Sequence, residues 1–184
     1  MPLPVTEVER ELTHTRRVRY EGYKRADGLW DIEAHLTDIK NHDFRLKSGV
    51  RRAGQPVHSM WLRVTVDRGF NIVEASAVSD AVPYSPGCEE IAPAYRQLVG
   101  LNLARDFRKN VAELFGGVRG CTHMSEMLAG MPTAAVQTFA GDMPEERPDG
   151  AKPFQLDQCH ALETSSETVR RWYPKWHRKE KSSA

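Results

Sequence analysis

One group of side chains in this sequence is suited to proton transfer, because it combines carboxylates, imidazoles and a phenol. Carboxylates beside histidines on adjacent strands can act as acid and base, since burial and pairing bring both groups towards neutral pH. A solvated sheet face, with charge pairs that involve Arg16 and Arg25, would give the same pattern. The candidate catalytic residues are His14, Asp31, Glu33, His35, Asp38 and Tyr84.

A second group is suited to metal binding. Thiolates and imidazoles are the usual ligands of zinc, and both also bind iron. Cys88 and Cys121 each follow a glycine and open a predicted helix, where the positive end of the helix favours the thiolate. The spacings match no zinc finger or ribbon, and cysteines buried as small apolar residues are the alternative. The candidate metal ligands are Cys88, Cys121, His123 and His58.

A predicted hairpin positions the first group. Residues 14–22 alternate as a strand, and Arg25-Ala26-Asp27-Gly28 predicts the turn, because the Asp-Gly pair tolerates positive φ. In the return strand, Leu29 to Leu36, alternation separates an apolar face from a polar one. The apolar face has Trp30, Ile32, Ala34 and Leu36, and the polar face has Asp31, Glu33 and His35.

The rest of the chain predicts two more strands and then helices. We expect a polar loop over 41–55, strands over 58–66 and 70–79, and helices over 88–99, 104–115 and 121–139, the last bent at Gly130 and Pro132. Strands followed by helices indicate an α+β fold, in which N-terminal antiparallel hairpins form a sheet covered by C-terminal helices. We expect a single domain over residues 1–184, a Pro/Glu/Asp loop over 142–153, a segment 154–176 that packs back, and flexible ends at 1–12 and 177–184.

Charge, hydropathy and cysteine content argue against several classes of partner and location. The 184 residues carry a net charge of +1, which argues against a nucleic-acid partner. No apolar run reaches the length of a membrane span or a signal peptide, and three cysteines cannot all pair, so a cytoplasmic protein is expected. A small molecule is the expected partner, with homo-oligomerisation left open. Neither a serine-hydrolase elbow nor a phosphate-binding glycine loop is present, and Gly116-Gly117 is interpreted as a helix cap.

Several separated motifs resemble the bacterial domain of unknown function 2889 family. The resemblance extends from about His14 to Trp176 and implies membership without an activity. The motifs are His14-Thr15-Arg16, Asp27 to Glu33, His35-Leu36-Thr37-Asp38, Gly120 to His123 and Cys159 to Leu162.

The order of elements from His58 to Thr138 is also similar to that of IscU/NifU-type iron–sulfur scaffold proteins. That similarity implies a zinc or cluster site in which Cys88, Cys121 and His123 match ligand positions. His58 stands near their first cysteine, and Met60 replaces an aspartate.

These observations leave three functions open. We expect a small enzyme of unknown substrate that uses acid/base chemistry of the lyase or isomerase type on a small organic compound, aromatic ones included, and no cofactor is assigned. A metal-binding or scaffold-like protein that carries zinc or iron is the alternative. A non-catalytic interaction module, with the aromatic and basic C-terminal segment as its docking surface, is the third.

Overall fold

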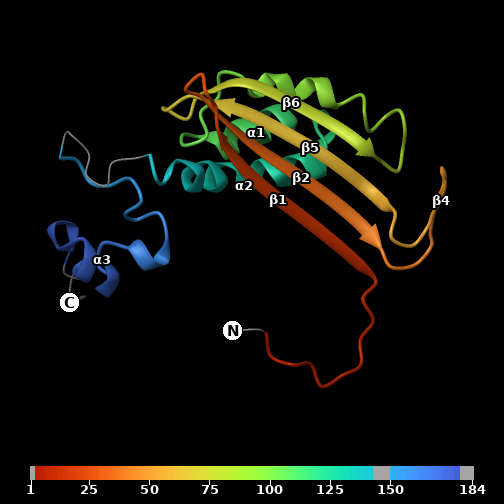
Figure 1. Ribbon diagram of the computed structural model, residues 1–184, viewed down its shortest axis with the longest axis horizontal. Helices are drawn as coiled ribbons and strands as arrows, with labels where there is room; N and C mark the ends of the chain where they lie inside the picture. Colours follow the sequence, from red (N-terminus) through yellow and green to blue (C-terminus); the bar gives the residue numbers. More distant parts are fainter. Residues whose placement is uncertain (1–2, 143–149, 179–184) are drawn as a thin grey trace. The chain divides into compact units, whose positions relative to one another are not determined.

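The computed structural model describes residues 3–142 and 150–178, and the chain divides into two compact units, Met1–Ala140 and Gly141–Ala184. The first unit contains an antiparallel sheet followed by helices, so the fold is α+β as predicted (Figure 1). Within the described residues, no helix is long and apolar enough to cross a membrane.

Four long strands form the main sheet in the order β1-β2-β5-β6, and each strand is antiparallel to its neighbours. The turn between the first two strands begins after Lys24, where the Arg25 amide donates to the Leu29 carbonyl and Gly28 has a φ of 84°. Sequence alternation therefore located this hairpin correctly. The strands are β1 (His14–Lys24), β2 (Trp30–Lys40), β5 (Pro56–Val66) and β6 (Ile72–Ala81).

The segment between β2 and β5 differs from the predicted polar loop. It contains a small hairpin of β3 (Phe44–Leu46) and β4 (Gly49–Arg51). Strands of three residues are too short to show an alternating pattern, so sequence periodicity could not reveal them.

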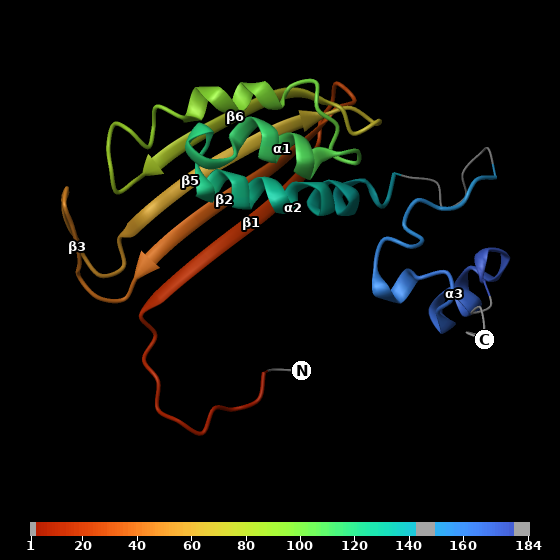
Figure 2. The same cartoon turned by 180° about the vertical axis from the view of Figure 1, so that it is seen from behind.

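The helices of the first unit lie against one face of the sheet, as Figure 2 shows from behind. The long helix α2 (Thr122–Phe139) crosses the sheet as one helix that contains Pro132, and α1 (Phe107–Phe115) lies beside it. The expected helix over 88–99 is instead the 3₁₀ helix η1 (Ala92–Leu98), because Pro93 is tolerated only in a first turn. A short 3₁₀ turn, η2 (Gly117–Arg119), joins α1 to α2, and Gly116 ends α1 as expected.

The core lies between the sheet and α2. Trp30, with 1% of its surface exposed, packs on the ring of Phe139 near the end of α2, with the ring centroids 4.5 Å apart. Close approach is possible because two glycines face bulky partners: a Cβ on Gly22 would overlap Thr138, and one on Gly130 would overlap Tyr20. The helix is thereby fixed in position over the first two strands.

The second unit contains three short helical segments among the described residues 150–178. They are η3 (His160–Leu162), α3 (Glu167–Trp172) and η4 (Pro174–Trp176). Ser166 caps α3, since its hydroxyl accepts from the amide of Val169. Most of the expected loop 142–153 and of the expected flexible end 177–184 lies outside the described residues, which omit 143–149 and 179–184.

Candidate functional site

The side chain of Asp38 is the centre of the candidate site. Asp38 follows Leu36 on the core face of β2, so its carboxylate is directed towards the helices and only 4% of the residue is exposed. Its neighbours across the sheet are Arg16 on β1 and His58 on β5. A β-bulge directly after Asp38 shifts the register so that the next residue, Ile39, pairs with Pro56. Bulges of this kind often lie beside functional sites, where they redirect a side chain.

Each oxygen of the carboxylate has several partners. Oδ1 accepts from His14 Nε2 at 2.7 Å and from Arg16 Nε at 2.9 Å. Oδ2 accepts from Arg16 at 2.8 Å and from His58 Nδ1 at 3.0 Å. The guanidinium therefore binds the carboxylate through two parallel hydrogen bonds, which is the strongest arrangement of this ion pair.

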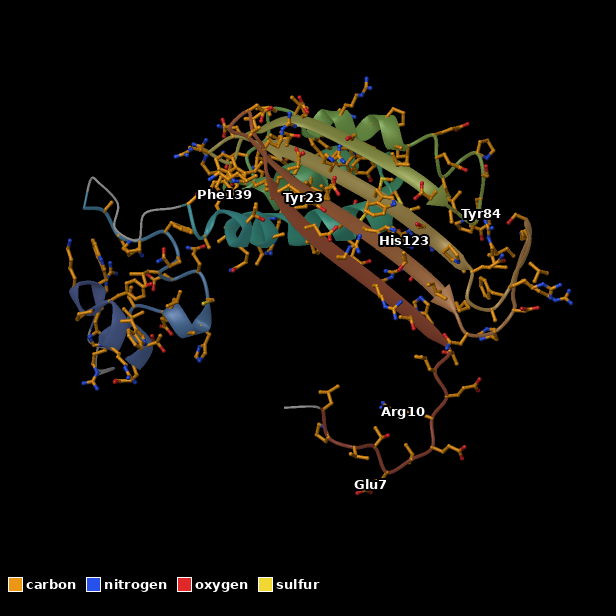
Figure 3. All side chains as sticks on the ribbon, viewed as in Figure 1. Glu7, Arg10, Tyr23, Tyr84, His123 and Phe139 are labelled. Carbon is orange, nitrogen blue, oxygen red and sulfur yellow. The ribbon has the colours of Figure 1, made fainter. Side chains whose placement is uncertain are left out.

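The start of α2 brings a third imidazole to the same carboxylate. His123 Nε2 lies 3.7 Å from Asp38 Oδ2, and the His123 and His58 rings are 3.9 Å apart between centroids. The other nitrogen of His123, Nδ1, is 3.8 Å from the sulfur of Cys121, the residue that precedes the helix. Tyr95 fixes this helix start, because its hydroxyl accepts from the Cys121 amide at 2.9 Å. Figure 3 labels His123 on α2.

The charges around Asp38 favour the ionised carboxylate. Burial alone would raise the pKa of Asp38, but hydrogen bonds from Arg16 and His14 outweigh it and hold that pKa well below its usual range. An ionised carboxylate can only accept hydrogen bonds, so the ring nitrogens that bond to it, His14 Nε2 and His58 Nδ1, carry the protons. When such a ring is neutral, its other nitrogen holds the lone pair.

The two more buried imidazoles are neutral at pH 7. Burial lowers the pKa of His58, and the neighbouring His123 lowers it further. Burial also lowers the pKa of His123, and the positive charge of Arg16 adds to this effect. Neutral imidazoles are able to accept a proton or to bind a cation.

The residues predicted for acid/base chemistry lie at separate places in the structure. His14 and Asp38 lie together, whereas Asp31, Glu33 and His35 lie on the opposite face of β2. Asp31 accepts from Arg25 and Thr65, and Glu33 accepts from Arg63. His35 stacks on Trp61 at 3.7 Å between ring centroids. This face therefore matches the alternative of cross-strand charge pairs.

Tyr84 is more than half exposed, in the segment that follows β6. Figure 3 labels Tyr84 on that segment and His123 on α2.

Of the residues predicted as metal ligands, the structure brings only the two histidines together at Asp38. Ligand atoms of His58, His123 and Asp38 all lie within 4.8 Å of one another. Cys121 contacts His123 but lies outside that group, and Cys88, which is half-buried and unpaired, also lies outside it.

Two site residues were not among the candidates: Arg16, named only for charge pairing, and Glu126, which accepts from Arg16 at 2.5 Å. Glu126 follows His123 by three residues, the helical spacing that places two side chains on one face.

Comparison with known proteins yields a family and no closer relative. No curated protein and no solved structure matches the chain, so the resemblance to iron–sulfur scaffolds gains no support from these comparisons. A family model described as "Protein of unknown function (DUF2889)" matches residues 14–137. The matched range begins at His14 and includes every residue around Asp38, but it ends before Cys159 and His160. Because the match covers more than half of the chain, the protein belongs to the DUF2889 family.

Proposed function

We propose that this protein is a small enzyme that abstracts a proton from a small organic substrate, with His14 as the base. The observation that carries the proposal is the 2.7 Å hydrogen bond from His14 Nε2 to the buried carboxylate of Asp38. This bond orients the ring and leaves Nδ1 to accept a proton. About a third of the His14 side chain is exposed, against 15% for His58 and 20% for His123, so His14 is the most accessible of the three rings.

Asp38 would contribute by stabilising the imidazolium that forms when His14 takes the proton, as an ionised carboxylate does for a paired histidine. Arg16 binds the same carboxylate through two hydrogen bonds, which keep Asp38 ionised for this role. Abstraction of a proton next to a carbonyl is a step shared by many lyases and isomerases, so the proposed reaction is of one of these types. Three free cysteines are in keeping with a cytoplasmic enzyme.

Proton exchange tests this function without knowledge of the product. The full-length protein is incubated in D₂O with a set of small carbonyl compounds, aliphatic and aromatic, and loss of the C–H signal is followed by NMR. We expect exchange in at least one compound, and a rate about 10²–10⁴-fold lower for His14→Gln, the usual contribution of a general base. His35→Ala is the matched control, because His35 lies on the other face of the sheet. Equal exchange by His14→Gln and wild type would refute the role of His14, and no exchange in any compound would refute the substrate class.

A further inference from the structure

Asp38, His58 and His123 have a geometry that hydrogen bonding alone does not explain. His123 Nε2 is 3.7 Å from Asp38 Oδ2, which is longer than a hydrogen bond, although the carboxylate is buried and the His123 side chain is only 20% exposed. His58 Nδ1 approaches the same oxygen at 3.0 Å. Three ligand atoms, one from each residue, thus converge within 4.8 Å from β2, β5 and α2.

These separations suit ligands that share one small ion. A tetrahedral zinc ion binds nitrogen and oxygen at about 2.0–2.2 Å, which places neighbouring ligand atoms about 3.3–3.5 Å apart. The distances of 3.0 and 3.7 Å lie on either side of this value. We propose that Asp38, His58 and His123 form a binding site for a divalent transition-metal ion of the zinc type.

Arg16 is the group that could oppose a cation, because its guanidinium binds the same carboxylate. Its charge is shared, however, with Glu126, which it contacts at 2.5 Å. Two carboxylates therefore face one guanidinium, and the cluster has an excess of negative charge for a cation to neutralise. A bound ion would replace the hydrogen bond from His58 Nδ1 to Oδ2, and the ring proton of His58 would move to Nε2 to free the Nδ1 lone pair. Oδ1 would keep its bonds to His14 and Arg16, and Oδ2 its bond to Arg16.

The surroundings of His123 fit a ligand role. Imidazoles that bind a metal through one nitrogen are generally held at the other by a hydrogen-bonding group, which fixes the ring orientation. Here the Cys121 sulfur lies 3.8 Å from Nδ1 of His123. Two imidazoles with one carboxylate select zinc and similar ions over calcium and magnesium, which prefer oxygen ligands. Three protein ligands also leave a coordination position for water or substrate.

The proposed metal site shares Asp38 with the proposed enzyme function but does not depend on it, because metal binding is measured without a substrate. The full-length protein is stripped with a chelator, dialysed and titrated with Zn²⁺ by calorimetry, and Co²⁺ is used to record the visible spectrum of the bound ion. We expect one ion per chain, and no competition from Mg²⁺ at equal concentration. Less than a tenth of an equivalent of Zn²⁺, or equal binding of Mg²⁺, would overturn the site.

Variants identify the ligands. His58→Gln and His123→Gln should each weaken Zn²⁺ binding at least 100-fold, which exceeds the 10–100-fold expected for a residue that only orients a ligand. His35→Gln, a histidine on the opposite face, is the matched control and should bind as wild type does. Circular dichroism identifies variants that fail to fold; should both fail, the nitrogen-ligand signature of the Co²⁺ spectrum of the wild type decides. Unchanged binding in folded His58→Gln or His123→Gln would overturn the assignment.

A last variant separates this inference from the enzyme proposal. His14→Gln leaves all three ligands in place, so it should still bind Zn²⁺ even where it loses proton exchange. Loss of Zn²⁺ binding in folded His14→Gln would contradict the assigned ligand set. Proton exchange by a wild-type protein that binds no metal would overturn the metal site and leave the enzyme function standing.

Discussion

Replacement of Asp38 by asparagine tests the electrostatics of the site, because it removes the charge and keeps the shape. Asp38 accepts four hydrogen bonds, two from Arg16 and one each from His14 and His58. One end of an asparagine amide is an NH₂ group, which would face donors that it cannot satisfy. A hydrogen bond to a charged group contributes about 1.5–3 kcal/mol. The Arg16 side chain is 36% exposed, so its bonds contribute less, as those of surface ion pairs do. We therefore expect Asp38→Asn to lose about 2–3 kcal/mol of unfolding free energy at pH 7.

The loss should depend on pH with a definite sign. The pKa of Asp38 is lower in the folded protein than in the unfolded chain, so its contribution to stability is complete above the unfolded value, about 3.9. The contribution declines as the pH falls below that value and disappears only below the folded pKa. The difference between wild type and Asp38→Asn should therefore be constant from pH 7 to about 5 and shrink below about 4.

Urea unfolding followed by far-UV circular dichroism measures this difference at each pH. Asp80→Asn is the matched control, because Asp80 is exposed and accepts one bond, from the Trp61 ring nitrogen. We expect it to change stability by less than about 0.5 kcal/mol. If Asp38→Asn stayed within 0.5 kcal/mol of wild type at pH 7, or if its deficit did not shrink in acid, the account of a charged, buried centre would be wrong.

Two further predictions concern the contact between α2 and the sheet. Gly130→Ala should destabilise the protein by about 1–3 kcal/mol, because its Cβ would lie within 3 Å of the Tyr20 ring and this overlap outweighs the gain of about 1 kcal/mol in helix propensity. Gly141→Ala, whose Cβ would contact nothing within 4 Å, is its control in urea unfolding, and equal stability of the two variants would contradict the prediction. Phe139→Ala should cost about 3–5 kcal/mol, since the ring is 2% exposed and packs on Trp30; a thermal midpoint within 2 °C of wild type would show that this packing matters little.

Strand alternation predicted most of the sheet, whereas the candidate site was grouped by residue type and not by face. The pattern that placed Trp30, Ile32, Ala34 and Leu36 on the core face continues to Asp38, the next residue of the same parity. His14 and Arg16 lie on the corresponding face of β1. Alternation alone therefore places Asp38 on the opposite face of β2 from Asp31, Glu33 and His35. Residue type, by contrast, puts all four into one set of polar side chains.

The contribution of α2 to the candidate site depends on tertiary structure. His123 reaches Asp38 because α2 lies over the first strands, and that position is fixed by contacts such as those of Gly22 and Gly130, which no local pattern encodes. Glu126 could be recognised only once His123 was known to face the sheet. Thiol and imidazole content suggested that Cys88 and Cys121 would act together, but residue type does not determine where the segment before η1 places Cys88.

The groups around Asp38 come from segments that are far apart along the chain. The Arg16–Glu126 pair closes a loop of 110 residues, and the His58–Asp38 pair closes one of 20. Contacts of such long range form only when the hairpins have paired and α2 has docked, so the assembled cluster exists in the native state and not in the unfolded ensemble. Anything that binds there stabilises the fold by mass action, by about 2.7 kcal/mol at a hundredfold excess over its Kd. The thermal midpoint of the intact chain can therefore serve as a screen for the natural ligand, whether that ligand is an ion or an organic molecule.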